Sequence, residues 1–145
     1  MTDNNFKELM ALDKYFIRPE SIKLPREQER KIYSLKSTTT EDSFIFDYDR
    51  RGRFELKYKE QLRYVKDICL VRLEVNAPQH MNPDGSITSR NHMHIYREGY
   101  GLSWAYEISE IFTEVSQKIT SLYLFKIFCE YCKIDASNIN LQGVL

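Results

Sequence analysis

The sequence predicts an α+β fold: an antiparallel meander of about four strands packed by C-terminal helices, with a short N-terminal helix. Apolar and polar residues alternate with a period of two through much of residues 43–96, which is typical of half-buried strands. Between residues 108 and 134 the apolar residues recur instead at helical spacing. The chain of 145 residues has the length of one domain, 1–145, and can bury a core without disulfides or a metal.

The N-terminal segment, residues 4–16, is expected to be a short amphipathic helix. Its apolar residues have helix-like spacing: Phe6, Leu9, Met10 and Phe16. Pro19 and Pro25 then favour an extended or turning connection. Residues 30–36 fit a strand and a helix equally well, and residues 34–43, SLKSTTTEDS, are typical of a loop.

The clearest hairpin is SFIFDYDRRGRFELKYK, residues 43–59, with its turn around Arg51 and Gly52. A self-consistent register pairs Tyr48 with Phe54, Phe46 with Leu56, and Phe44 with Tyr58. One face is then aromatic. The other face carries the charged residues Asp47, Asp49, Arg53, Glu55 and Lys57.

Residues 67–76 are expected to form a third strand and residues 92–96 a fourth, around a turn at Asn82-Pro83-Asp84-Gly85. Alternation assigns Cys69, Val71, Leu73 and Val75 to the core face, and it assigns Arg72, Glu74, His92, His94 and Tyr96 to one polar row. Placing Val75 opposite Met93 pairs Asn76 with His92, Glu74 with His94, and Arg72 with Tyr96.

Two helices should follow. The first is predicted by the apolar residues Ile108, Ile111, Phe112, Val115 and Ile119. The second, LYLFKIFCEYCKI over residues 122–134, can be capped by Thr120 or Ser121. It is apolar nearly all round, so we expect it to be deeply buried over the aromatic face of the sheet.

The composition excludes several classes of protein. Lys plus Arg and Asp plus Glu are both 21, and this zero net charge argues against a general nucleic-acid binder and against an acidic DNA mimic, although local patches are compatible with it. Three cysteines indicate no disulfide framework and favour a reducing, cytoplasmic compartment. The N-terminus does not have the pattern of a signal peptide, and no apolar run approaches the roughly 18 residues that span a membrane.

All three histidines fall within residues 78–96, which predicts a metal site on the polar row. A His-x-His pair on a strand projects both rings to one side, so the two imidazoles can converge on one ion. The predicted ligands are His80, His92, His94, Glu74 and Asp84, with Glu98 as a further carboxylate. Nitrogen and oxygen ligands of this kind fit zinc best.

Two other interpretations of the same residues remain open. One is a solvated polar hairpin face. The other is an enzyme in which His92 and His94 act as acid and base, Arg72 holds a phosphate and Tyr96 donates a hydrogen bond. Cys129 and Cys132 share a helix face but lie in an apolar helix, where cysteine packs as a small hydrophobe. A site that joins them to the histidines requires this helix to pack on the polar face.

Two further features are candidates for contacts. Arg50, Arg51 and Arg53 form a basic hairpin tip, which fits a solvated turn or the binding of a nucleic acid or an acidic partner. Trp104 is expected to anchor the turn that follows the histidine strand in the core; the alternative is a place on a binding surface.

The segment from Leu70 to Trp104 resembles a family of small uncharacterised proteins of Gram-positive bacteria, their prophages and phages. The shared pattern is His-x-Asn-Pro-Asp-Gly, then His-x-His-x-Tyr, then Gly and Trp-Ala. The matching residues are His80, Asn82, Pro83, Asp84, Gly85, His92, His94, Tyr96 and Trp104. The chain is also similar in size and character to type II-A anti-CRISPR proteins, some of which carry a structural zinc.

These likenesses imply a small phage or mobile-element protein that inhibits a host defence component by direct protein binding. The expected partner is a host protein such as a CRISPR effector nuclease, with any zinc serving structure. The alternative function is a histidine-dependent nuclease, for example a toxin, that uses the His92 and His94 face.

Overall fold

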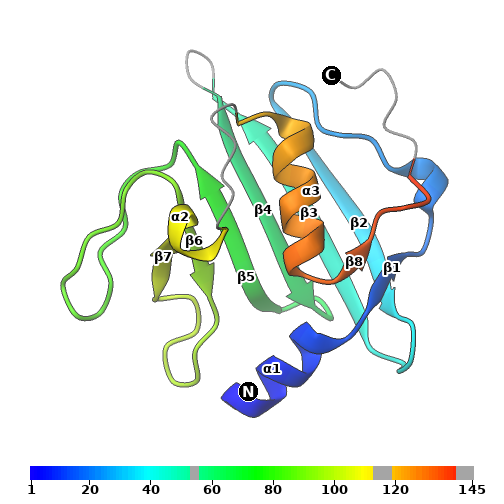
Figure 1. The fold of residues 1–145 in the computed structure, drawn as a ribbon, viewed down its shortest axis with the longest axis horizontal. Helices are drawn as coiled ribbons and strands as arrows, with labels where there is room; N and C mark the ends of the chain where they lie inside the picture. Colours follow the sequence, from blue (N-terminus) through cyan, green and yellow to red (C-terminus); the bar gives the residue numbers. More distant parts are fainter. Residues whose placement is uncertain (53–55, 113–118, 140–145) are drawn as a thin grey trace.

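In a computed structural model, which describes residues 1–52, 56–112 and 119–139, the chain has the predicted α+β fold (Figure 1). The strands are β1 (Lys14–Phe16), β2 (Glu29–Ser37), β3 (Ser43–Arg51), β4 (Lys57–Tyr64), β5 (Ile68–Val75), β6 (His92–Ile95), β7 (Ala105–Glu107) and β8 (Ile134–Asp135). The helices are α1 (Asp3–Ala11), α2 (Ile108–Ile111), α3 (Ser121–Tyr131) and the 3-10 turn η1 (Pro19–Ser21).

The strands form one eight-stranded sheet in the order β7-β6-β5-β4-β3-β2-β1-β8. Each strand from β1 to β7 pairs antiparallel with the next, and only β8 returns to lie parallel to β1. The predicted meander is therefore confirmed but is larger than four strands. The added strands include β1, β7 and β8, which have two or three residues each and are too short to show a periodic pattern. Residues 30–36, ambiguous in the sequence, belong to β2.

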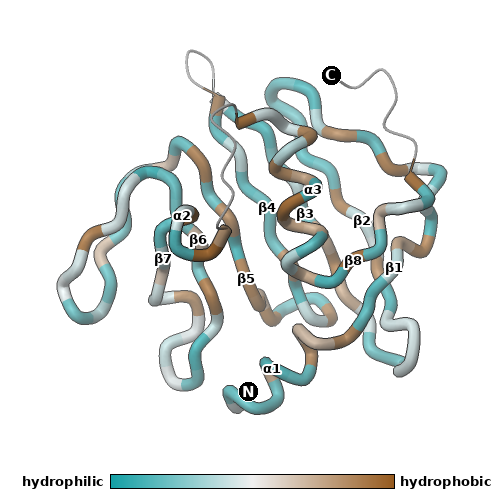
Figure 2. The backbone as a smooth tube through the Cα atoms, viewed as in Figure 1, coloured by the Kyte–Doolittle hydropathy of each residue, from teal (hydrophilic) through white to brown (hydrophobic). Residues whose placement is uncertain are grey.

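Helix α3 covers the aromatic face of the sheet, in front of β3 and β4 (Figure 1). Thr120 caps it, because its hydroxyl oxygen accepts a hydrogen bond from the backbone N–H of Tyr123 at 3.1 Å. Phe125 and Phe128 meet the ring of Phe46 edge to face, with centroids 5.9 and 5.3 Å apart. Burying one such ring contributes about 1.5–3 kcal/mol. Both the helix and the sheet beneath it carry hydrophobic segments (Figure 2).

The helix is buried on one side and is less deeply buried than its apolar sequence predicts. The fully buried side is formed by Leu124, Phe125, Phe128 and Cys129. Lys126 and Glu130 are exposed on the other side. The helix lies on the sheet as a single layer, and nothing among the described residues buries its outer side.

The predicted register of the 43–59 hairpin is also wrong, although the aromatic face is confirmed. β3 continues to Arg51, so Arg51 pairs with Lys57, and the same register places Phe46 opposite Leu62. The chain turns later than expected, and the second strand runs six residues further along the sequence than the predicted pairing requires. Phe54, Glu55 and Arg53 lie outside the described residues.

At the N-terminus, helix α1 ends at Ala11, and Phe16 lies in strand β1 instead of the helix. The strand is held by Lys14, whose buried ammonium donates to the carbonyl oxygens of Leu12 at 2.8 Å and Cys132 at 2.9 Å. Further along, α2 is a single turn over Ile108–Ile111, and the predicted helical position Val115 falls outside the described residues. No helix in the described parts of the chain is both long enough and apolar enough to cross a membrane.

Strand β5 departs from strict alternation. Leu62 pairs with Val71, but the next residue, Arg63, pairs with Cys69, so Leu70 is an extra residue in β5. This bulge moves Cys69 off the core face, where alternation had assigned it. Its thiol lies 3.7 Å from the side-chain oxygen of Gln61, on the polar face. Beyond the bulge, Val71, Leu73 and Val75 are buried as predicted.

Candidate metal centre

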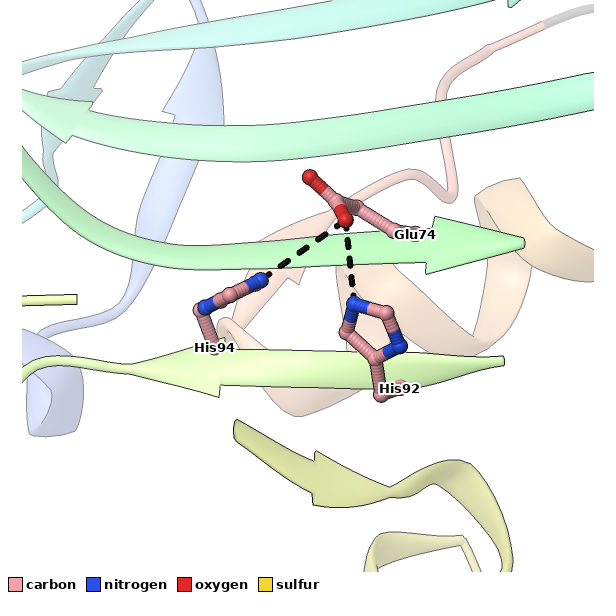
Figure 3. A group of neighbouring side chains, drawn as sticks. All are labelled: Glu74, His92 and His94. Carbon is pink, nitrogen blue, oxygen red and sulfur yellow. Dashed lines mark hydrogen bonds and ion pairs between the residues drawn. The ribbon is translucent and has the colours of Figure 1, made fainter. Parts of the chain in front are cut away.

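Strands β5 and β6 place the polar row on the side of the sheet away from α3 (Figure 3). His92 lies directly opposite Glu74, and His94 lies directly opposite Arg72. The shared face of these four residues is confirmed, but the predicted pairing is wrong by two residues. Strand β5 ends at Val75, because the following Asn76 has a positive φ of 59° and turns the chain out of the strand.

Three potential ligand atoms converge at this point (Figure 3). The Oε2 atom of Glu74 lies 3.0 Å from Nε2 of His92 and 3.6 Å from Nε2 of His94. All three atoms lie within 4.8 Å of one another. In a tetrahedral zinc site with ligand distances of 2.0–2.1 Å, neighbouring ligand atoms lie about 3.3 Å apart. The two measured distances lie on either side of that value, so these residues are close enough to bind one metal ion.

The other ring nitrogen of each histidine is already bonded. Nδ1 of His92 lies 2.9 Å from the carbonyl oxygen of Ser89, and Nδ1 of His94 lies 2.7 Å from the carbonyl oxygen of Leu102. A carbonyl oxygen can only accept, so both Nδ1 atoms carry the proton. In the neutral imidazole, Nε2 then holds the lone pair that a metal requires. This is the usual outer-shell arrangement of metal-binding histidines.

The cluster is electrostatically biased towards a bound cation. Burial alone would raise the pKa of Glu74, but donation from Nε2–H of His92 and His94 in their protonated form, together with the charge of Arg72, outweighs it and holds this pKa well below its usual range. Burial would lower the pKa of His92, but the hydrogen bond to Glu74 and the Ser89 carbonyl raise it. Both histidines are buried, so water screens these interactions little.

The centre opens into a cleft of about 540 Å³. Its lining residues include Arg72, Gln79, His80, Leu102 and Ser103, together with the three ligand candidates. Arg72 forms an ion pair with the other carboxylate oxygen of Glu74, at 2.9 Å. The cleft gives an incoming molecule access to the centre while the histidine rings stay buried.

The loop that follows β6 supplies the carbonyl groups bonded to His94 and His80, whereas Ser89, bonded to His92, precedes this strand. Arg97 and Gly101 form an isolated bridge, and the Arg97 guanidinium lies 4.2 Å from the centre of the Trp104 ring. Trp104 is only half-buried and lies outside the hydrophobic core cluster, so the expected anchoring in the core is wrong; its ring contacts Arg97 and Tyr100 of the same loop instead. The loop thereby fixes the carbonyl groups of Leu102 and Ser103.

His80 comes from the long loop between β5 and β6, which does fold back over the strand pair. Its ring centre lies 4.6 Å from that of His94. Its Nε2 atom is bonded to the carbonyl oxygen of Ser103 at 2.7 Å, so only its Nδ1 is free for a ligand role. The loop is positioned by Asn82, whose side-chain oxygen accepts from the N–H of Ala105 at 2.8 Å and whose amide donates to the Ala105 carbonyl at 3.0 Å.

The other predicted acidic ligands lie elsewhere. A carboxylate oxygen of Asp84 accepts from the backbone and the hydroxyl of Ser86, inside the turn. Glu98 accepts from the backbone N–H of Asp3 at the start of α1. Tyr96 also turns towards α1, where its hydroxyl donates to the Met1 carbonyl at 2.6 Å.

Cys129 and Cys132 are buried in the core beneath α3, and burial raises the pKa of both thiols far above the usual range. The sheet separates them from the histidines, so a joint site is ruled out by the side on which the helix packs. At the hairpin tip, Arg51 is exposed and pairs with Asp49 at 3.5 Å, and Arg50 lies over the Tyr58 ring. Arg53 lies outside the described residues.

Sequence reasoning missed the groups that orient the rings. Thr88 approaches Nδ1 of His92 at 3.1 Å, and three backbone carbonyls bond to the histidines. Backbone carbonyls carry no residue-specific signal, so only the folded loops reveal them. The nearest signal in the sequence was the Asn-Pro-Asp-Gly turn that contains Asn82.

Comparison with known proteins gives a family for the chain. No curated protein and no solved structure matches it. A family model described as "Family of unknown function (DUF6978)" matches residues 1–134, which include every described residue of the candidate centre. The chain therefore belongs to this family of unknown function, DUF6978.

Proposed function

We propose that this protein is a metal-binding protein that holds one divalent transition metal, with zinc preferred, through Glu74, His92 and His94. The observation that carries the proposal is the meeting of three acceptor atoms. With Nδ1 protonated on both rings, two Nε2 lone pairs face one carboxylate oxygen. A buried arrangement of this kind needs a cation at its centre, either a metal or additional protons on the rings.

The donor set favours a metal over protons alone. Two imidazoles and one carboxylate are a common ligand set of zinc in sites that keep a fourth position for water or another molecule. The cleft of about 540 Å³ supports such an open position. Among the described histidines, His80 is the remaining candidate for a fourth protein ligand, through its Nδ1 atom, since its Nε2 is engaged by Ser103.

The test is elemental analysis of protein purified without a histidine tag, followed by titration of the metal-free protein with Zn²⁺. We expect near-stoichiometric metal in the natural chain and its loss in His92→Ala and His94→Ala. Glu98→Gln is a matched control, because Glu98 is a carboxylate outside the cluster and should leave metal binding unchanged. Metal-free protein that takes up no Zn²⁺, Co²⁺ or Ni²⁺ at micromolar concentration would show that the cluster is a protonated ion pair.

The sequence predicts two alternative functions for the chain, host-defence inhibition and a histidine-dependent nuclease. Inhibition of a host defence component, such as a CRISPR effector nuclease, remains a prediction, and so does a phage origin. The alternative of a histidine-dependent nuclease also remains a prediction. The open cleft favours a site that receives a ligand over a purely structural metal, because structural zinc sites are usually closed by four protein ligands.

A further inference from the structure

The polar face of the sheet also carries an excess of positive charge beside the candidate metal centre. Across β2, β3 and β4 this face holds six cationic side chains and two carboxylates: Arg30, Lys36, Arg51, Lys57, Lys59 and Arg63 with Asp47 and Asp49. Lys36 is paired with Glu41 of the β2–β3 turn at 3.1 Å, and the other five lie towards the candidate metal centre. The whole chain has a net charge of zero, so this excess is a local concentration. Arg30, Lys59 and Arg63 keep 45, 37 and 21% of their side chains exposed.

The carboxylates do not neutralise this face. Buried Asp49 is shared by Arg30, Arg51 and Lys59, at 3.4, 3.5 and 3.6 Å. Lys57 is exposed and has no ion pair among the described residues, and it lies directly opposite Arg51 in the sheet. Like charges in directly opposed positions are unfavourable, and a bound anion relieves that repulsion.

A second, smaller cleft of about 190 Å³ lies at these side chains. Its lining includes Asp49, Arg51, Lys57 and Lys59. Glu74 and Pro78 line both this cleft and the larger one that holds the candidate metal centre. One ligand can therefore contact the cations and the metal centre at the same time.

We propose that these adjoining clefts bind a phosphodiester chain, the backbone of a single-stranded nucleic acid. One phosphate lies on Arg51, Lys57 and Lys59, and a neighbouring phosphate reaches the centre at Glu74. The second contact rests on the proposed metal site, whereas the first does not. Neighbouring strands lie about 4.8 Å apart, so the cations on β3 and β4 and the metal on β5 and β6 form a line of positive sites. A repeating polyanion matches such a line, and a single carboxylate does not.

Binding of this kind should not depend on base sequence, because lysine and arginine contact phosphates irrespective of the base. The probe is a fluorescent oligothymidylate about twelve nucleotides long, within the range that single-strand-binding surfaces occupy. Its binding to the full chain is followed by fluorescence anisotropy at several salt concentrations. Lys57→Gln and Lys57→Glu are the test variants, because exposed Lys57 can change without disturbing a buried partner. Lys126→Gln, on the exposed side of α3, is the matched control.

We expect Lys57→Gln to weaken binding and to reduce the slope of log K against log salt by about 0.7, the value for one phosphate contact of a single strand. Lys57→Glu should weaken it further, and Lys126→Gln should leave it unchanged. A Lys57→Gln variant that binds like Lys126→Gln would overturn the proposal. Equally tight binding of thymidine monophosphate would exclude a chain, and equal competition by polyglutamate would assign the face to an acidic protein.

The same assay separates this proposal from the metal site. Chelator-treated protein and His94→Ala should lose metal but keep binding that is sensitive to Lys57, with lower affinity. If the natural chain holds no metal and Lys57-sensitive binding persists, the metal proposal fails and the phosphodiester contact at the cations stands. If metal is bound and no oligothymidylate binds, the phosphodiester proposal fails alone.

Discussion

The Oε2 atom of Glu74 lies 3.0 Å from Nε2 of His92, across the β5–β6 pair. Both side chains are held from behind, Glu74 by Arg72 and His92 by the carbonyl of Ser89. The pair is therefore positioned before any metal arrives, which reduces the cost of ordering ligands on binding.

Metal should stabilise the folded chain. Because the unfolded chain has no preformed site, Zn²⁺ at about 100 times its dissociation constant should raise the free energy of unfolding by about 2.7 kcal/mol. Chelation should remove this increment from the natural chain and have no effect on His94→Ala. Thermal unfolding with and without chelator measures both. Equal chelator sensitivity in the two proteins would contradict the assignment of His94 as a ligand.

Asn82→Ala should weaken metal binding without touching a ligand. The side chain of Asn82 makes two hydrogen bonds to the backbone of Ala105, and these hold the loop that carries His80 over the cleft. Their loss leaves buried polar groups of Ala105 unpaired and should cost about 1–3 kcal/mol. Calorimetric Zn²⁺ titration together with urea unfolding tests this. Ser86→Ala, in the same turn, serves as control and should have a smaller effect on Zn²⁺ affinity.

Glu60→Gln should stabilise the protein at neutral and higher pH. The Glu60 carboxyl is buried in β4 on the core face, and neither of its oxygens has a hydrogen-bond partner among the described residues. Burial raises its pKa well above the usual range. Above about pH 4.5 the unfolded chain releases this proton while the folded chain keeps it, so stability falls as the pH rises.

The amide of Glu60→Gln cannot ionise, so we expect a gain of about 1–3 kcal/mol at pH 8 and little gain near pH 4.5. Urea unfolding at the two pH values measures the difference. Glu130→Gln, on the exposed side of α3, should show no such pH-dependent gain. The prediction is wrong if the difference in free energy of unfolding between Glu60→Gln and the natural chain is the same at both pH values.

Asp47→Ala should destabilise the sheet strongly. The buried Asp47 carboxylate accepts from Arg63 at 2.7 and 3.0 Å and from Gln61 at 2.8 Å. Removing a buried partner leaves charge and polar groups unpaired, at a cost of about 3–5 kcal/mol. Because Arg63 is only about four-fifths buried, the lower end of this range is expected. Comparison of its free energy of unfolding with that of Asp42→Ala, at the β2–β3 turn, separates the loss of the buried Asp47 carboxylate from the loss of a carboxylate in a turn.

The pH dependence of Asp47 has the opposite sign to that of Glu60. Burial would raise the pKa of Asp47, but hydrogen bonds from Arg63 and Gln61 outweigh it and hold the pKa below its usual value. Its stabilising contribution is therefore complete above the unfolded pKa near 3.9 and is lost as the pH falls through the folded pKa. Acid titration of Asp47→Asn should show a smaller loss of stability in that range than the natural chain.

The sequence by itself determined the fold class, a helix cap at Thr120 or Ser121, and the face on which most residues of the central strands lie. These features are local, since a period of two or of 3.6 residues and a capping hydroxyl depend only on near neighbours in the chain. For the same reason alternation placed Glu74, His92 and His94 together on one face. It failed at the bulge, where one extra residue reversed the side of Cys69, and at Tyr96, which follows the end of β6 and contacts Phe6 of α1 instead of the polar row.

Only the tertiary structure decided the pairing registers, the depth of the site and its outer shell. Register depends on where a strand ends and how long the connecting loop is, and the positive φ at Asn76 shifted the β5–β6 pairing by two residues from that predicted. The carbonyls of Ser89 and Leu102 reach the histidines through loops, and backbone groups leave no mark in the sequence. Alternation could assign the three ligand candidates to one face, but long-range packing alone brings their atoms within reach of a single ion.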